Sequence, residues 1–93
     1  MKATIQKDVL KMLNNHPEVA WAIDFRSELS SIIGQMIDGR LLAIEVKQPG
    51  KEPTSEQYEF LAKVNANRGI GFWVYSPVQV DQIMSKLDIL AAV

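Results

Sequence analysis

The chain has 93 residues, of which 47% are hydrophobic and 23% charged, so we expect one globular domain spanning residues 1–93. The absence of cysteine excludes disulfides, thiolate metal sites and a cysteine nucleophile, and a single histidine excludes a multi-histidine zinc site within one chain. A formal net charge of −1 lacks the basic excess of a typical nucleic-acid-binding domain, so any such binding must be local.

The hydropathy of the sequence does not predict a membrane span. No apolar run approaches the roughly 20 residues that a membrane span needs. The amino terminus, "MKATIQKDVLKML", carries charge throughout, where a signal peptide has an unbroken apolar core. We therefore expect a cytoplasmic protein without membrane contact, and the chemistry left to it is that of carboxylates, lysines and hydroxyls.

The first elements in the chain are a predicted helix and a predicted strand. Apolar residues recur at helical spacing over residues 4–15, with polar residues on the other side, which predicts an amphipathic helix. It should end near Asn15, because Pro17 disfavours helical geometry at the residue before it. That residue, His16, is then expected in a loop and not as a ligand. The β-branched and aromatic run from Val19 to Phe25 predicts a strand.

A β-hairpin is predicted next, from two apolar runs on either side of Asp38-Gly39. Glycine accepts the positive φ of such a turn without steric cost. The loop length remains open. A three-residue loop puts Ser31 opposite Glu45, whereas a two-residue loop puts Ser30 opposite Lys47. Either register places a serine in a strand position facing a charged residue.

The second half of the chain predicts helix, strand and helix. Thr54 and Gln57 fit a capping box that opens a helix, and the run Ile70 to Ser76 predicts a buried strand. Ser76-Pro77 then signals the start of a last helix. The predicted fold is α/β: helix, three-stranded antiparallel meander, helix, strand and helix. The last strand joins through a crossover, giving a small mixed sheet flanked by helices.

Glu45 and Lys47 interrupt the apolar strand "LLAIEVK", and alternation along a strand puts both on one face. Buried charges are normally paired, hydrated or bound to metal. One interpretation is an edge strand whose outer face meets water. The other is a site in which a carboxylate holds a hard divalent cation and the lysine stabilises negative charge. Gln57 points inward and either only closes its capping box or reaches this face.

The stretch of sequence around Glu45 resembles a known protein family. The stretch "DGRLLAIEVKQPGKEPTSEQYEFL", preceded by "SSIIGQMI" and followed by "GIGFWVYS", resembles the virus-type replication-repair nuclease domain, VRR-NUC, of the PD-(D/E)XK nuclease superfamily. The resemblance implies a restriction-endonuclease-like core and Mg²⁺- or Mn²⁺-dependent hydrolysis of DNA phosphodiester bonds. It assigns the metal-binding acid to Glu45, the catalytic lysine to Lys47 and the glutamine of the following helix to Gln57.

The same resemblance implies the remaining site residues and partners. Metal ligands would be Glu45, Val46 and Ser31, and contacts with DNA would come from Gln48, Lys51 and Arg26. The expected substrate is branched DNA such as a Holliday junction, the expected assembly is a homodimer, and the expected setting is a bacterial or phage-infected cell.

The sequence departs from the family pattern in three places, and these departures lead to more than one functional hypothesis. Ser31 stands where an aspartate is usual, residues 2–4 stand where a glutamate is usual, and the connection Arg26 to Leu29 is short. Asp24 and Glu28 are the candidate replacement acids. The first hypothesis is a metal-dependent endonuclease with impaired activity. The alternative is a catalytically degenerate nuclease fold that binds DNA or a protein without cutting, and a third is a small subunit of a larger assembly.

Overall fold

A computed structural model describes the backbone of residues 2–92 and the side chains of residues 2–87, so both end residues of the predicted domain 1–93 lie outside it. Over the described backbone no helix is long and apolar enough to cross a membrane. The elements follow the predicted order: α1 (Lys2–Asn14), β1 (Val19–Asp24), β2 (Ile32–Met36), β3 (Leu41–Val46), α2 (Ser55–Ala66), β4 (Ile70–Val74) and α3 (Pro77–Ala92).

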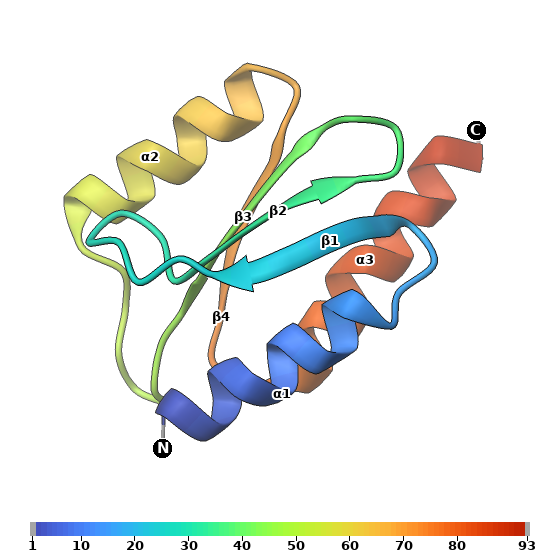
Figure 1. Cartoon of the computed structure of the whole chain (residues 1–93). Helices are drawn as coiled ribbons and strands as arrows, with labels where there is room; N and C mark the ends of the chain where they lie inside the picture. Colours follow the sequence, from blue (N-terminus) through green and yellow to red (C-terminus); the bar gives the residue numbers. More distant parts are fainter. Residues whose placement is uncertain (1, 93) are drawn as a thin grey trace.

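The four strands form one mixed sheet in the order β1-β2-β3-β4. The first three make an antiparallel meander, and β4 runs parallel to β3 after a crossover through α2. Helices α1 and α3 cover one face of the sheet and α2 lies on the other (Figure 1). The predicted fold class is confirmed.

The hydrophobic core is divided by the sheet into two parts. The larger part lies under α1 and α3, and the smaller part lies under α2. Adjacent residues of β3 serve different parts, with Ile44 in the larger and Ala43 in the smaller, because strand side chains alternate between faces. Each helix contributes the residues that its helical spacing predicts, among them Val9, Leu61 and Met84. The sheet is therefore buried on both faces around β3.

The hairpin between β2 and β3 has a three-residue loop. Met36 N–H donates to the Arg40 carbonyl at 2.8 Å, and Gly39, at φ +94°, donates to the Met36 carbonyl at 2.9 Å. In the resulting register Ile32 pairs with Ile44, which puts the preceding Ser31 opposite Glu45. The three-residue alternative is confirmed and the two-residue alternative is wrong.

Contacts between Asp38 and Arg40 stabilise the turn of this hairpin. The backbone N–H of Arg40 donates to one Asp38 carboxylate oxygen at 3.1 Å, and the Arg40 guanidinium donates to the other at 2.7 Å. These contacts hold the pKa of Asp38 below its ordinary value despite a partial loss of hydration. Asp38 is thus a turn residue, far from the other end of the hairpin.

Candidate functional site

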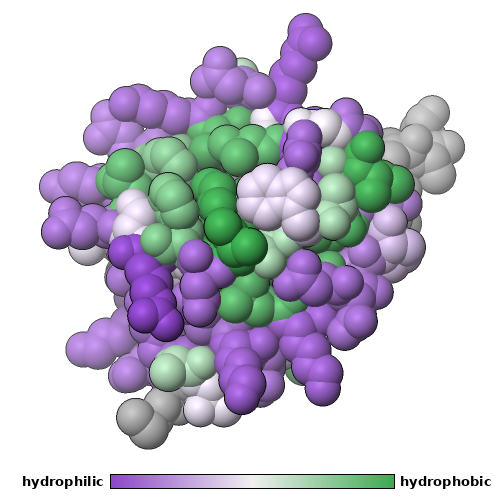
Figure 2. Space-filling model, in the orientation of Figure 1, coloured by the Kyte–Doolittle hydropathy of each residue, from purple (hydrophilic) through white to green (hydrophobic). Residues whose placement is uncertain are grey.

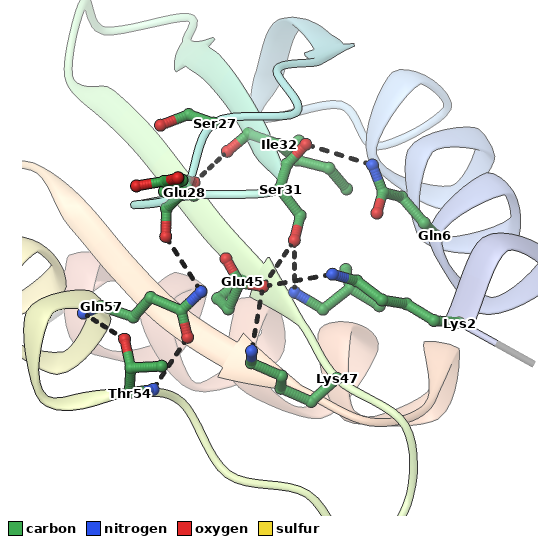
Figure 3. Close-up of polar contacts among 12 residues, drawn as sticks. Lys2, Gln6, Ser27, Glu28, Ser31, Ile32, Glu45, Lys47, Thr54 and Gln57 are labelled. Carbon is green, nitrogen blue, oxygen red and sulfur yellow. Dashed lines mark hydrogen bonds and ion pairs between the residues drawn. The ribbon is translucent and has the colours of Figure 1, made fainter.

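Ser31 and Glu45 meet at the end of the hairpin that lies away from its turn. The Ser31 hydroxyl donates to Glu45 Oε1 at 2.8 Å and accepts the Val46 backbone N–H at 3.1 Å (Figure 3). Glu45 is only 1% exposed, because β3 is an inner strand of the sheet. The interpretation of Glu45 as a solvent-facing residue of an edge strand is therefore wrong.

Two lysines approach the same carboxylate oxygen. Lys47 Nζ lies 3.8 Å from Glu45 Oε1, and its side chain is 17% exposed. Lys2 Nζ lies 3.6 Å from the same oxygen, and its side chain is 42% exposed. Figure 3 shows the two side chains reaching Glu45 from different elements, Lys47 from the end of β3 and Lys2 from the first turn of α1. One buried carboxylate thus faces two ammonium groups.

Lys2 is the functional residue that sequence reasoning missed. The resemblance marked residues 2–4 as a place where an acid was absent, and it gave no sign that a cation there contacts Glu45. The contact depends on how α1 packs against the end of the sheet. The available sequence signal was a basic residue in the stretch that precedes Ile5 and Gln6.

The second carboxylate oxygen of Glu45, Oε2, is buried in a different environment from Oε1. Oε2 has no hydrogen-bond partner among the residues that the structure describes. A buried, unpaired acceptor is costly, and a buried carboxylate requires compensation by opposite charge. In the described part of the chain that compensation comes from Lys2 and Lys47.

Gln57 closes its capping box and also holds the loop before Ser31. Its Oε1 accepts the Thr54 backbone N–H at 2.9 Å, and its own backbone N–H donates to Thr54 Oγ1 at 3.2 Å. Its Nε2 donates to the Glu28 carbonyl at 3.0 Å (Figure 3). Both ends of the amide are engaged with backbone, so the geometry gives Gln57 a positioning role. Its role as a catalytic residue stays a prediction.

The candidate replacement acids lie elsewhere. Asp24 pairs with Ile32 in the sheet, one residue out of phase with Ser31, so its side chain belongs to the α1 face. There its Oδ1 accepts Gln6 Nε2 at 2.7 Å. Glu28 is exposed in the loop, and its contact with Gln57 uses the backbone carbonyl. Asp24 therefore does not share a face with Glu45.

These residues do not fit a divalent cation. In residues with described side chains, no cluster of three or more His, Cys, Asp or Glu could hold a metal ion. The implied donor set is one carboxylate from Glu45, a neutral hydroxyl from Ser31 that already bonds Glu45, and one neutral backbone carbonyl from Val46. Hard cations favour carboxylate oxygens, and two ammonium groups beside Glu45 repel a third positive charge.

A cavity of about 660 Å³ adjoins this cluster on the α1 side. Its charged lining residues are Lys2, Lys7, Arg26 and Asp24, so cations outnumber carboxylates three to one. Arg26 adopts φ +52° and lies 3.8 Å from Asp24, with most of its side chain exposed. Lys2 lines this cavity and also contacts Glu45, so its side chain links the cavity to the Glu45 cluster.

The predicted DNA contacts after β3 lie in an exposed turn. Gly50, at φ +87°, follows Pro49, and Lys51 N–H donates to the Gln48 carbonyl at 3.0 Å, as in a type II turn. Figure 1 shows the start of α1 beside the loop that leaves β3. Gln48 and Lys51 are thus exposed near the end of the sheet that carries Glu45.

The fold of this chain is similar to that of a known solved domain. A solved structure of a VRR_NUC domain superposes with a TM-score of 0.66 at 18% sequence identity, covering 90% of this chain and 94% of that chain. No protein-family model matches the chain, and no curated protein sequence does either. The predicted resemblance is confirmed at the level of the fold, which is that of a VRR_NUC domain.

Proposed function

We propose that this chain is a DNA-binding protein of the VRR_NUC fold that engages the phosphodiester backbone at the Glu45 end of its sheet without cutting it. The observation that carries the proposal is the pair of ammonium groups, from Lys2 and Lys47, on a single buried carboxylate. That arrangement leaves one positive charge in excess and a site poor in metal ligands. It favours binding of an anion over hydrolysis by a metal ion.

Local charge supports the choice of a phosphodiester as the ligand. The chain as a whole has a net charge of −1, so uniform attraction to DNA is absent. The cavity that Lys2 lines nevertheless also carries Lys7 and Arg26, against the single carboxylate of Asp24 among its described lining residues. Contacts of lysine and arginine with phosphates supply the sequence-independent part of DNA affinity. Branched DNA suits the proposal because it presents two phosphate backbones to the region that contains Lys2, Lys7 and Arg26.

The test is DNA binding as a function of salt, measured by fluorescence anisotropy with four-way junction and linear duplex DNA. Affinity should fall linearly on logarithmic axes as salt rises, with a slope of about −0.9 per phosphate contact. Lys51→Ala should weaken binding to both DNAs and reduce that slope by about one. Lys63→Ala is the matched control, because Lys63 is exposed on α2 and pairs with Glu59. Salt-independent binding, or equal losses in both variants, would contradict the proposal.

A second candidate is a metal-dependent endonuclease that uses Mg²⁺ or Mn²⁺ on branched DNA. The observation in its favour is Glu45 Oε2, a buried carboxylate oxygen without a hydrogen-bond partner among the described residues. A cation is one group that would satisfy this oxygen. The candidate ranks second because it requires the ion to displace or tolerate Lys2 and Lys47.

We also propose a homodimer, formed through an apolar face of the sheet. Trp21 and Ile23 alternate along β1 on the face that carries α2, Phe25 directly follows the strand, and all three are exposed. Helix α2 packs over β3 and β4 and leaves this strip uncovered. A band of apolar surface crosses the view in Figure 2 over the region of β1 and β2. A second copy of the chain would bury the strip against its own counterpart in a twofold interface.

A further inference from the structure

We propose that the Lys2 ammonium is the resident cation of the Glu45 site, so that the site excludes divalent ions and binds phosphate oxygens without them. The claim that the site binds phosphate oxygens rests on the proposed function. The claim that the site excludes divalent ions rests only on the contacts of Lys2 and Glu45. Lys2 Nζ lies 3.6 Å from Glu45 Oε1, and Glu45 is 1% exposed.

The position of Lys2 is built into the packing of α1. Lys2 and Gln6 are separated by one helical turn and therefore lie on the same side of the helix. Gln6 Nε2 donates to the Ser31 carbonyl at 3.1 Å and to Asp24 Oδ1 at 2.7 Å, which ties this side of α1 to the ends of β1 and β2. Ser31 in turn bonds Glu45. The same contacts that anchor the helix thus direct Lys2 to the carboxylate.

The charge balance at Glu45 explains why a metal ion would compete with Lys2. A buried carboxylate needs a counter-charge, and Lys2 and Lys47 supply it among the described residues. A divalent ion at the same carboxylate would add to two existing positive charges. Removing the Lys2 charge lowers that repulsion and leaves Glu45 less compensated, so metal affinity should rise.

Among the described residues Lys2 Nζ pairs with Glu45, and this pairing leaves N–H donors for an anion. An ammonium group has three N–H donors, and its distance of 3.6 Å from Glu45 Oε1 exceeds that of a direct hydrogen bond. The side chain is 42% exposed and lines the cavity that Lys7 and Arg26 also line. A phosphodiester in this cavity would meet Lys2 on its open side while Glu45 holds the ammonium from behind.

The first experiment measures Mn²⁺ binding by calorimetry in the absence of DNA. Lys2→Gln removes the charge and keeps a long polar side chain, so it should bind Mn²⁺ at least tenfold more tightly than the wild type. Glu45→Gln added to Lys2→Gln should abolish the gain. Lys2→Arg should exclude Mn²⁺ like the wild type, and Lys11→Ala, a change in the last turn of α1, should have no effect. Equal Mn²⁺ affinity of the wild type and Lys2→Gln would overturn the inference.

The second experiment measures DNA affinity in EDTA and in Mn²⁺. Wild-type affinity should be the same in both, whereas Lys2→Gln should lose about tenfold in EDTA and recover with Mn²⁺. A wild-type protein that binds DNA only with Mn²⁺ would overturn the inference. If the wild type binds DNA under neither condition, the proposed function fails, while the calorimetric comparison still decides whether Lys2 excludes the metal. Circular dichroism of each variant confirms that it is folded.

Discussion

Ser31 connects two strands and a carboxylate through one hydroxyl. It donates its proton to Glu45 Oε1 and accepts the Val46 N–H with one lone pair. A hydroxyl is neutral, and it therefore orients Glu45 without adding the negative charge that a hard cation prefers. Lys2 and Lys47 supply the positive charge instead. At the scale of single residues, the charge of Glu45 is therefore already compensated by lysines, with one positive charge in excess.

Ser31→Asp tests this balance directly. A second carboxylate beside Glu45 would create a pair of like charges that a divalent cation relieves. We expect the wild type to cleave a four-way junction no faster than Glu45→Gln in Mg²⁺ or Mn²⁺, and Ser31→Asp to acquire Mn²⁺-dependent cleavage. The measurement is product formation on denaturing gels. Metal-dependent cleavage by the wild type that Lys47→Ala abolishes would establish the endonuclease and contradict a binding-only role.

Both edge strands of the sheet are capped by an asparagine from a neighbouring helix. Asn14 of α1 donates to the Ala22 carbonyl and accepts the Ala22 N–H, each at 3.0 Å. Asn65 of α2 makes the same pair of bonds with Gly71, each at 2.8 Å. Gly71 suits this position, because a Cβ there would lie 2.9 Å from the Leu61 carbonyl oxygen. The amides pair backbone groups that an edge strand otherwise offers to another chain.

We expect Asn14→Ala and Asn65→Ala each to lower the free energy of unfolding by roughly 1–3 kcal/mol, because each removes partners from two backbone groups. Asn15→Ala is the control, since the Asn15 amide follows α1 directly and donates only locally, to the Lys11 carbonyl of that helix. The two effects should add, because β1 and β4 lie at opposite edges of the sheet. Urea denaturation followed by circular dichroism measures them. Losses no larger than that of Asn15→Ala would contradict a capping role.

At the scale of the whole molecule, the three helices cover the sheet unequally. Helices α1 and α3 cover one face, whereas α2 lies over β3 and β4 and not over β1 (Figure 1). The apolar strip along β1 is therefore exposed. Trp21 on this strip also donates to Gln35 Oε1 at 3.0 Å, which holds its ring against the neighbouring strand. The capped backbone at Ala22 disfavours strand addition at this edge. A partner would therefore dock on the face of the sheet and not extend it.

Ile23→Lys should prevent dimerisation without unfolding the protein, because Ile23 is 52% exposed at the middle of the strip. Sedimentation equilibrium should find a concentration-dependent dimer for the wild type and a monomer for the variant. Ile37→Lys is the matched control, since Ile37 is 61% exposed but lies in the hairpin loop. A monomeric wild type at all concentrations, or equal effects of the two variants, would rule out this interface.

Local patterns in the sequence determined most of the fold. Helical spacing and strand alternation predicted every element in its order, because these patterns record which side of an element is buried. Turn and cap residues act over a few positions, so the Asp38-Gly39 turn and the capping box of Thr54 and Gln57 were also predictable. The pairing of Glu45 with Lys47 on one face followed from the two-residue period of a strand.

Tertiary structure alone decided how the site is completed. The sequence left the hairpin register open, and packing of the sheet selected the one that joins Ser31 to Glu45. Lys2 reaches Glu45 because α1 docks at a particular angle and height on the sheet, a result of many long-range contacts that no local pattern contains. The sequence by itself determined that Glu45 and Lys47 share one face of a strand, and the tertiary structure decided that Glu45 is buried there and that a second lysine contacts it.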